Sequence, residues 1–485
     1  MNIGFLTIPT VLTVLFVVDF FFAITVIFIE RKTPAATLAW VMVIFLVPVV
    51  GIFFYVMLSQ NIAKQKLYRL TQRERELFET HLSMQIDAVK QGSFTYRSQK
   101  ESKWKDLILL NQHYSHAYLS QDNRLEIFTD GNHLFASLLA DIRAAKESIN
   151  LQYFIVKNDV TGRRLISELT QKAREGVHVR FLLDALGSRR QSAAKLAEFR
   201  EAGGSYALFF PPKFRYLNMK LNYRNHRKIV VVDGRVGYLG GYNIGNEYLD
   251  KKKKFGHWRD THLRLEGEGV ADLNTQFFLD WRIASREEVS LETAYQDRPA
   301  GEGSTAIQIV NSGPESLKEE IKHTYLRMIN SAKRNVYIQS PYFVPDLSIF
   351  ESLQNAAFAG VDVRVMIPNK PDHAFVYWAT YYYCGLLLRA GVRVFIYDKG
   401  FLHAKTLCVD GEVCSVGSAN FDNRSFRLNF ETNAVIYDED ETFKLESIFE
   451  QDIADSIELT RALYAKRSLR IKFKEGISKL LSDLL

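Results

Sequence analysis

Cysteine is scarce in this chain. Only three of the 485 residues are cysteines, Cys384, Cys408 and Cys414, and their spacing fits neither a disulfide framework nor a metal-binding motif. The scarcity argues against a small disulfide-stabilised secreted protein and favours a reducing compartment. Hydrophobic residues make up 47% of the chain, which supports packed cores, and the length suits roughly two to four domains.

Charge is almost absent from the first 58 residues. Residues 3–29 are apolar except for Asp19, and residues 35–58 carry no charged side chain. Each run exceeds the ~20 helical residues that cross a hydrocarbon core. A signal peptide is not expected, because residues 1–4 lack a basic side chain and the apolar run is too long; buried core helices are the other alternative. The pattern predicts a two-span transmembrane hairpin over residues 1–58.

Basic residues predict how this hairpin is oriented. The net charge of +7 would suit nucleic acid or an anionic membrane surface equally well. The basic residues after the second run are Lys64, Lys66, Arg69, Arg73 and Arg75, and those in the turn are Arg31 and Lys32. The more basic flank is expected in the cytoplasm, which leaves both termini and the hydrophilic bulk there. Asp19 is either a functional group or a hydrogen-bonded helix contact.

The rest of the chain predicts an α/β architecture. Residues 59–105 are polar and charged with helical periodicity, and predict a linker helix region. Residues 106–300 and 301–485 then run in parallel, because in both of them helical patterns alternate with β-rich runs such as 177–184 and 361–368. This alternation is typical of an α/β fold with a largely buried sheet.

One motif occurs twice in the chain. Residues 224–247 read RNHRKIVVVDGRVGYLGGYNIGNE, and residues 401–425 read FLHAKTLCVDGEVCSVGSANFDNRS. The matched pairs are His226 with His403, Lys228 with Lys405, Asp233 with Asp410, and Asn243 with Asn420. All four share one separation (403 − 226 = 177). Four positions in register indicate an internal duplication, and two tandem halves related by pseudo-twofold symmetry are the hypothesis.

The Asp in each copy has the context of a turn residue. Asp233 and Asp410 each precede a Gly and stand between two apolar runs, a pattern that favours a hairpin turn. We therefore interpret both as turn formers or structural acceptors rather than as residues that touch a substrate.

The other repeated residues suit a phosphoryl group. Side chains alternate along a strand, so the His and Lys of each copy point the same way. If the halves face each other, two imidazoles, two ammonium groups and two Asn amides converge, as a phosphoryl group with developing negative charge requires. No carboxylate cluster with metal spacing lies nearby. Neither a metal nor another cofactor is expected, since the Lys side chains would neutralise the charge.

Two acids are candidates for orienting the imidazoles. One imidazole would attack phosphorus and the other would transfer protons, and each needs an acceptor for its second ring nitrogen. Asp260 in WRDTHL and Glu431 in NFETNA both precede a Thr at the start of a strand-like run. Within each half, Asp260 lies 34 residues after His226 (260 − 226 = 34) and Glu431 lies 28 after His403 (431 − 403 = 28). Because these separations differ, the pairing of Asp260 stays open.

On these residues the chain resembles the phospholipase D superfamily and, within it, the bacterial cardiolipin synthases of the two-span type. The resemblance is carried by the paired His-x-Lys-x4-Asp motifs and by the runs RKTPAATLAW, NHRKIVVVDG, WRDTHLRL, SPYFVPD and GSANFDNRSF. It implies two α-β-α sandwich halves. It also implies transfer of a phosphatidyl group between two phosphatidylglycerol molecules, giving cardiolipin and glycerol through a phosphatidyl-histidine intermediate without a metal.

The resemblance also implies roles for the repeated residues. The catalytic set comprises His226, Lys228, Asp233, His403, Lys405 and Asp410. In this set His226 is the expected nucleophile and His403 the expected acid and base. The lysines, with Asn243 and Asn420, would hold phosphate oxygens, and Ser418, opposite Gly241 of the first copy, would add a one-sided hydroxyl contact.

The implied partners are phosphatidylglycerol and other membrane lipids, with no nucleic acid, and the oligomeric state is left open. The implied location is the bacterial inner membrane, multi-pass, with cytoplasmic catalytic halves. Two alternatives stay open. One is a phospholipase D-type hydrolase, nuclease or transphosphatidylase with a different acceptor; the other is a catalytically silent membrane scaffold. Intact His and Lys in both copies argue against the scaffold.

Two basic segments keep two interpretations each. Lys251, Lys252, Lys253 and Lys254 form either a solvated loop or an attractor of anionic headgroups. Residues 461–485 are basic with recurring Leu, Ile and Phe. They either lie on the inner leaflet as an amphipathic helix or pack only on the core.

Overall fold

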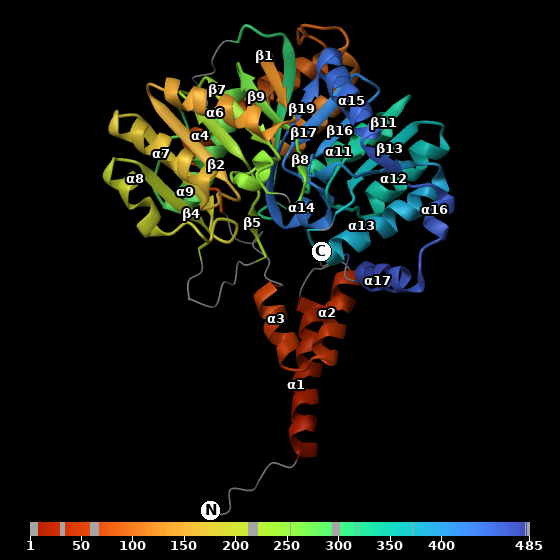
Figure 1. Cartoon of the computed structure of the whole chain (residues 1–485). Helices are drawn as coiled ribbons and strands as arrows, with labels where there is room; N and C mark the ends of the chain where they lie inside the picture. The colour runs from red at the N-terminus through yellow and green to blue at the C-terminus, as the bar shows by residue number, and fades with distance from the viewer. Residues whose placement is uncertain are drawn as a thin grey trace, which may run out of the picture.

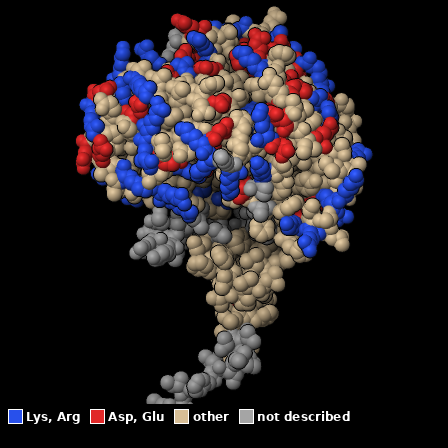
Figure 2. All heavy atoms as spheres, viewed as in Figure 1, with Lys and Arg blue, Asp and Glu red and all other residues tan. Residues whose placement is uncertain are grey.

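The protein consists of an α/β body on a narrow stalk of apolar helices (Figure 1). The computed structural model describes residues 8–29, 34–58, 67–211, 222–252, 254–292, 301–316, 318–370, 372–480 and 482. The stalk leaves one end of the body, and charged side chains cover the body but not the visible side of the stalk (Figure 2).

Three helices form the stalk: α1 (Ile8–Ile29), α2 (Pro34–Leu46) and α3 (Val50–Leu58). The second apolar run is therefore not one helix. Pro48 cannot continue the helical hydrogen-bond ladder, Val49 takes a positive φ of 65°, and α3 turns back along α2. A Cβ on Gly51 would lie 2.6 Å from the carbonyl oxygen of Val43.

The expected pair of continuous spans is not confirmed. Within the described ranges, no helix has the combination of length and apolarity that a membrane crossing needs. Asp19 of α1 is buried. Of the basic residues used to orient the hairpin, Arg31, Lys32, Lys64 and Lys66 lie outside the described residues.

One sheet of 16 strands runs through the body. In spatial order the strands are β20 (Ser456–Glu458), β14 (Arg393–Tyr397), β13 (Asp362–Pro368), β11 (Asn335–Gln339), β16 (Thr406–Val409), β17 (Val413–Gly417), β19 (Asn429–Tyr437), β10 (Thr305–Ser312), β1 (Leu119–Phe128), β9 (His262–Glu266), β7 (Val236–Gly240), β6 (Ile229–Val232), β2 (Ser148–Tyr153), β3 (His178–Asp184) and β4 (Ser205–Phe209), with β5 (Arg224–Asn225) paired beside β19.

The sheet is symmetric about its central pair of strands, because equivalent strands of the two halves follow in the same order on either side. β1 and β10 pair antiparallel, with Leu119 opposite Gln308. From β1 the order is β9, β7, β6, β2, β3, β4, and from β10 it is β19, β17, β16, β11, β13, β14. Each half thus contributes seven equivalent strands, which confirms the mixed α/β fold and the two tandem halves.

Helices cover both faces of the sheet. On the first half, α6 (Gly131–Ala144) and α7 (Val160–Arg174) cover one face and α9 (Gly269–Ser285) the other; on the second half, α11 (Glu320–Ser331), α12 (Leu347–Phe358) and α13 (Ala374–Leu387) lie opposite α15 (Glu439–Ala454). Neighbouring strand residues face different cores, since Val230 packs in the α6–α7 core and Val231 in the core shared by α9 and α15. This alternation buries the sheet on both sides.

Shorter elements complete the body. They are α4 (Gln72–Gln91), α5 (Lys105–Ser115), α8 (Ala197–Glu201), α14 (Asn423–Arg427), α16 (Arg461–Ala465), α17 (Leu469–Leu480), the 3₁₀ turns η1 (Glu101–Trp104), η2 (Ala193–Leu196), η3 (Asn246–Leu249) and η4 (Leu388–Ala390), and two small sheets, β12 (Phe343–Val344) with β18 (Phe421–Asp422) and β15 (Gly400–Leu402) with β8 (His257–Arg259). Thr71 and Glu74 form a capping box at the start of α4.

Candidate active site

The Asp of each repeat occupies a hairpin turn. Asp233 and Asp410 have φ values of 50° and 57°, and each is followed by a Gly with φ of 65°, as a two-residue hairpin turn requires. The carboxylate of Asp233 accepts three backbone N–H bonds of 2.8 Å, from Lys146, Glu147 and Ser148. Asp410 does the same for residues 333–335. These bonds bind each turn to the start of β2 or β11, so the two carboxylates are structural acceptors and not members of the catalytic centre.

Each motif His is held by a strand of the opposite half. The backbone N–H of His226 donates to the carbonyl of Phe430 at 2.9 Å, next to the parallel pair β5–β19. The backbone N–H of His403 donates to the carbonyl of Arg259 at 2.7 Å, next to the parallel pair β15–β8. The two motifs therefore cross the boundary between the halves.

The crossing decides which acid faces which imidazole. Nδ1 of His226 lies 3.0 Å from Oε2 of Glu431, and Nδ1 of His403 lies 2.6 Å from Oδ2 of Asp260. The pairing that the sequence left open is therefore crossed between the halves, because the segment that carries each acid lies beside the motif of the other half. Both acids are fully buried.

Charges and hydrogen bonds in the centre lower the pKa of both acids, whereas burial lowers the pKa of both imidazoles. Burial alone would raise the pKa of Glu431, but the charges of His226 and Lys228 and hydrogen bonds outweigh it and lower this pKa. For Asp260, Lys405 and His403 likewise outweigh burial and lower the pKa. Burial lowers the pKa of His226 to about 4 and also lowers that of His403.

The two lysines are buried cations. Burial is the main cause that lowers the pKa of Lys228 to about 7 and that of Lys405 to about 8. Each Nζ donates to the carbonyl of its own motif His, at 2.6 Å for Lys228. A bound anion would favour the charged form of both lysines, because a nearby opposite charge raises the pKa of an amine that burial has lowered.

The two copies form one centre rather than two. The charge of Lys405 contributes to lowering the pKa of His226, and the charge of Lys228 contributes to lowering that of His403. Aromatic rings line both imidazoles, with centroid distances of 4.9 Å from Phe154 to His226 and 5.2 Å from Trp258 to His403.

Ser418 and Gly241 each contact one of the two acids. Oγ of Ser418 donates to Glu431 and accepts from the backbone N–H of Thr432 at 3.0 Å. A Cβ on Gly241 would lie 2.0 Å from Oδ1 of Asp260, so only Gly allows this acid to approach. The hydroxyl contact expected between Ser418 and phosphate is thus replaced by a contact with Glu431.

The asparagines lie buried at the ends of the return strands. Oδ1 of Asn243 accepts from the backbone N–H of Ile155 at 3.1 Å, and the backbone N–H of Asn420 donates to Ser425 Oγ at 3.2 Å. These bonds fix the positions of both residues.

Sequence reasoning missed a buried charge network behind the centre. Nη1 of Arg227 lies 2.8 and 2.9 Å from the two carboxylate oxygens of Asp280 in α9, and its Nε donates to the carbonyl of Glu431 at 3.0 Å. Tyr68, before α4, donates its hydroxyl to Asp280 at 2.7 Å. Two signals were present: Arg227 stands between His226 and Lys228, so strand alternation turns it to the opposite face, and Asp280 interrupts the apolar run FFLDW.

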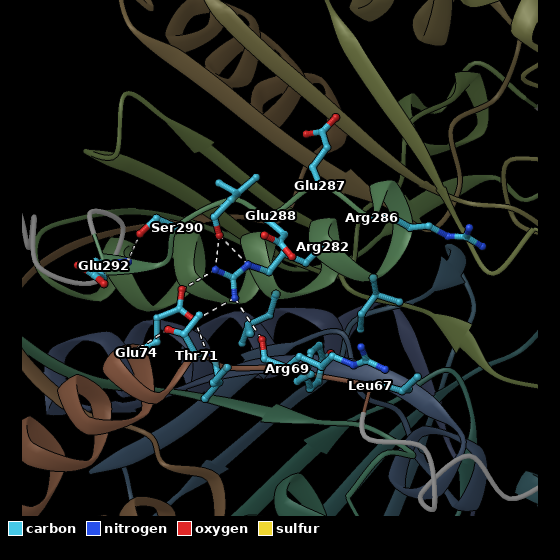
Figure 3. Close-up of a pocket in the computed structure, with 15 residues that line it drawn as sticks. Leu67, Arg69, Thr71, Glu74, Arg282, Arg286, Glu287, Glu288, Ser290 and Glu292 are labelled. Atoms are coloured by element: carbon cyan, nitrogen blue, oxygen red, sulfur yellow. Dashed lines mark hydrogen bonds and ion pairs between the residues drawn. The ribbon is translucent and has the colours of Figure 1, made fainter.

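Two cavities lie beside the segment that precedes α4, apart from the His–Lys residues. One of about 710 Å³ lies between residues 67–74 and the end of α9, where Glu74 and Arg282 form an ion pair of 2.5 Å (Figure 3). The other, of about 440 Å³, lies behind the centre and is lined by Tyr68 and Arg227. In the part of the chain that the structure describes, no three His, Cys, Asp or Glu side chains are arranged to hold a metal ion.

Two family models match this chain, over three segments. The model described as "Cardiolipin synthase, PLD-like domain" matches residues 138–262 and 325–453. The model described as "Phospholipase_D-nuclease N-terminal" matches residues 17–60. The first model therefore covers both repeats together with their acids.

Curated relatives match over nearly the full length. A cardiolipin synthase of Listeria monocytogenes serotype 4b is 47% identical over 475 residues, which are 98% of this chain and 98% of the relative. One of Staphylococcus aureus is 47% identical over 471 residues, covering 97% of this chain and 95% of the relative. Among solved structures, phosphatidylserine synthase of Haemophilus influenzae shares the fold, with a TM-score of 0.59, 15% identity and coverage of 78% of this chain and 96% of that chain.

Proposed function

The chain belongs to the cardiolipin synthase family of phospholipase D-like enzymes, and on that premise we propose that it is a phosphatidyltransferase that makes cardiolipin and glycerol from two phosphatidylglycerol molecules. The observation that carries the proposal is the crossed pairing of His226 with Glu431 and of His403 with Asp260. It brings two neutral imidazoles, two anionic acids and two buried ammonium groups to one centre, as the transfer of an anionic phosphoryl group requires.

His226 is the proposed nucleophile of the first step. Its Nδ1 faces Glu431, so Nε2 is the nitrogen that can attack phosphorus, and Glu431 stabilises the positive ring that forms. A bond forms between Nε2 and phosphorus while the bond from phosphorus to the glycerol oxygen breaks. The leaving oxygen takes a proton from His403, whose pKa the bound phosphodiester anion raises by charge attraction.

The second step reverses these roles. A terminal hydroxyl of the second phosphatidylglycerol gives its proton to His403, and its oxygen attacks phosphorus. The bond to Nε2 of His226 breaks, and cardiolipin leaves. Lys228 and Lys405 neutralise the phosphoryl oxygens in both steps, and Asn243 and Asn420 are the proposed amide donors to them. No step of this scheme needs a metal ion.

The proposed place of the reaction is the inner face of the bacterial cell membrane, where both substrates reside. The apolar stalk of α1, α2 and α3 is the proposed membrane anchor, since its outer side chains, such as Phe16 and Phe28, are exposed and apolar. The proposed domain division is 1–58, 59–105, 106–300 and 301–485, with the first part as anchor and the last two as catalytic halves.

Product analysis tests the proposal. Purified full-length protein is incubated with phosphatidylglycerol vesicles, and cardiolipin, phosphatidic acid and glycerol are measured together. We expect cardiolipin and glycerol in equal amounts, and retention of configuration at a chiral phosphorus because two inversions cancel. Phosphatidic acid as the main product would show that water is the acceptor, and net inversion would exclude the histidine intermediate.

A further inference from the structure

The C-terminal helix α17 packs on the body with its polar side. Glu475 is only 3% exposed and forms an ion pair of 2.9 Å with Arg467. Ser478 is also buried, and Ser482 Oγ lies 3.2 Å from the hydroxyl of Tyr383 in α13. A helix of a water-soluble body normally buries its apolar side, so α17 has the reverse arrangement.

The apolar side of α17 faces away from the body. Leu469, Phe473 and Leu480 are 81%, 70% and 72% exposed. Phe473 and Leu480 lie four and eleven positions after Leu469, which places all three on one helix face. Three large side chains on one face of a short helix form a continuous apolar stripe that water covers unfavourably.

Cations flank this stripe. The exposed basic residues of α17 are Arg470, Lys472, Lys474 and Lys479. The ammonium groups of Lys474 and Lys479 lie 5.0 and 5.1 Å from the ring centroids of Trp378 and Tyr382 in α13, so their stems lie along the helix pair. The one acidic side chain of α17, Glu475, is buried on the other side. An apolar stripe with basic margins complements an anionic phospholipid surface.

The position of α17 agrees with that partner. The helix lies at the end of the body from which the stalk emerges (Figure 1), and basic side chains gather there beside the stalk (Figure 2). A second copy of this chain would bring the same cations against each other, which disfavours association through this face.

We propose that α17 lies flat on an anionic bilayer, with Leu469, Phe473 and Leu480 at the boundary between headgroups and acyl chains. The basic residues then contact lipid phosphates. This surface attachment needs no helix that crosses the membrane, and it rests on the proposed function only in taking an anionic phospholipid as partner. It would hold the second half against the lipid surface independently of the N-terminal stalk.

Site-specific labelling tests the proposal in the full-length protein. The native cysteines Cys384, Cys408 and Cys414 are all buried, so a single added surface Cys can be labelled selectively. Phe473→Cys carries an environment-sensitive dye, and the protein is reconstituted in phosphatidylglycerol vesicles that contain brominated lipid. We expect a blue-shifted emission and strong quenching.

The matched control is Phe443→Cys, because Phe443 is 68% exposed on α15, away from the stalk. We expect its dye to report water and to escape quenching. Equal behaviour of the two dyes would overturn the proposal, and this outcome does not depend on whether the protein makes cardiolipin.

An activity measurement adds a second arm. Replacing Leu469, Phe473 and Leu480 together by Gln should raise the apparent KM on phosphatidylglycerol vesicles several-fold while turnover in detergent micelles stays at the level of the native protein. A loss in both assays, or in neither, would contradict a lipid-docking role for α17.

Discussion

The two halves build one centre with different residues. In the first half, Asp280 of α9 is paired with Arg227 from inside the repeated motif. In the second half, Asp452 of α15 is paired with Arg259, which directly precedes Asp260 in the first half. The counterpart of Arg227 is Ala404 (404 − 227 = 177), and the counterpart of Arg259 is Phe430 (430 − 259 = 431 − 260 = 171).

Both arginines nevertheless hold the same kind of partner. Arg227 donates to the carbonyl of Glu431, and Arg259 donates to the carbonyl of Asp260. Each therefore fixes the backbone of an acid that faces an imidazole. A Gln on the neighbouring strand also donates to each helix aspartate, from Gln152 to Asp280 at 2.6 Å and from Gln339 to Asp452 at 2.8 Å.

The comparison shows what duplication preserved. A buried aspartate without a counter-charge is costly, and each half has an Arg–Asp pair, although the two arginines come from different positions. The first half has an additional contact, since Tyr68 from the segment that follows the stalk donates to Asp280.

The largest expected loss of activity follows from removing either imidazole. His226→Ala and His403→Ala should each lower kcat by about 10³-fold or more, because the two steps need both groups. Cardiolipin formation under saturating phosphatidylglycerol is the measurement. Substantial turnover in either variant would mean that the two copies do not act as one centre.

Next in size is the exchange of the acids. Glu431→Gln and Asp260→Asn should each lower kcat by about 10²-fold, because a neutral partner no longer stabilises a charged imidazole. Histidine NMR titration tests the crossing: Glu431→Gln should lower the pKa of His226 further and leave His403 nearly unchanged, and Asp260→Asn should do the opposite. A shift in the imidazole of the same half would contradict the crossed pairing.

Removing either arginine should destabilise the protein by a similar amount, although the two arginines come from different positions in the chain. Arg227→Met and Arg259→Met each leave a buried aspartate unpaired, and each should lower the free energy of unfolding by about 3–5 kcal/mol. Denaturant unfolding of both variants measures this. A large loss in only one of them would show that only one half depends on its pair.

The two lysines should make kcat/KM and the free energy of unfolding change in opposite directions as pH rises. Lys228 and Lys405 have pKa values of about 7 and about 8, below the ordinary 10.5, so kcat/KM should fall as pH rises above this range because the ammonium charge is lost. The folded chain binds fewer protons than the unfolded chain between about pH 7 and 10.5, so their contribution to stability should rise with pH in that window. A kcat/KM that stays flat to pH 9.5 would contradict the ammonium role.

The smallest expected effect concerns the Tyr68–Asp280 contact, which has no counterpart at Asp452 among the described residues. Tyr68→Phe removes the hydrogen bond to Asp280 and the one that the hydroxyl accepts from Arg227 at 3.0 Å. It should cost about 1–2 kcal/mol of stability, with kcat reduced and KM unchanged if Asp280 positions Glu431 through Arg227. Tyr238→Phe is the control, since the Tyr238 hydroxyl also donates to a carboxylate, that of Asp141, away from the centre. The same kcat in both variants would reduce Tyr68 to a structural contact.

Local patterns determined much of this protein from its sequence. The duplication, the His and Lys of each copy and the Asp-Gly turns follow from spacing and alternation, because these depend on neighbours in the chain. The alternation of helical and β-rich runs predicted the α/β class, and the motifs predicted the family. The same local logic missed the break at Pro48, where a hydropathy sum cannot see that a helix turns back.

Only the tertiary structure decided the partners of these residues. His226 meets Glu431 across 205 positions, because strands of different halves pair, and no spacing within one copy carries that information. Arg227 and Asp280 meet for the same reason. The reversed packing of α17 also depends on α13, since the sequence shows that a helix has two faces but not which of them the body covers.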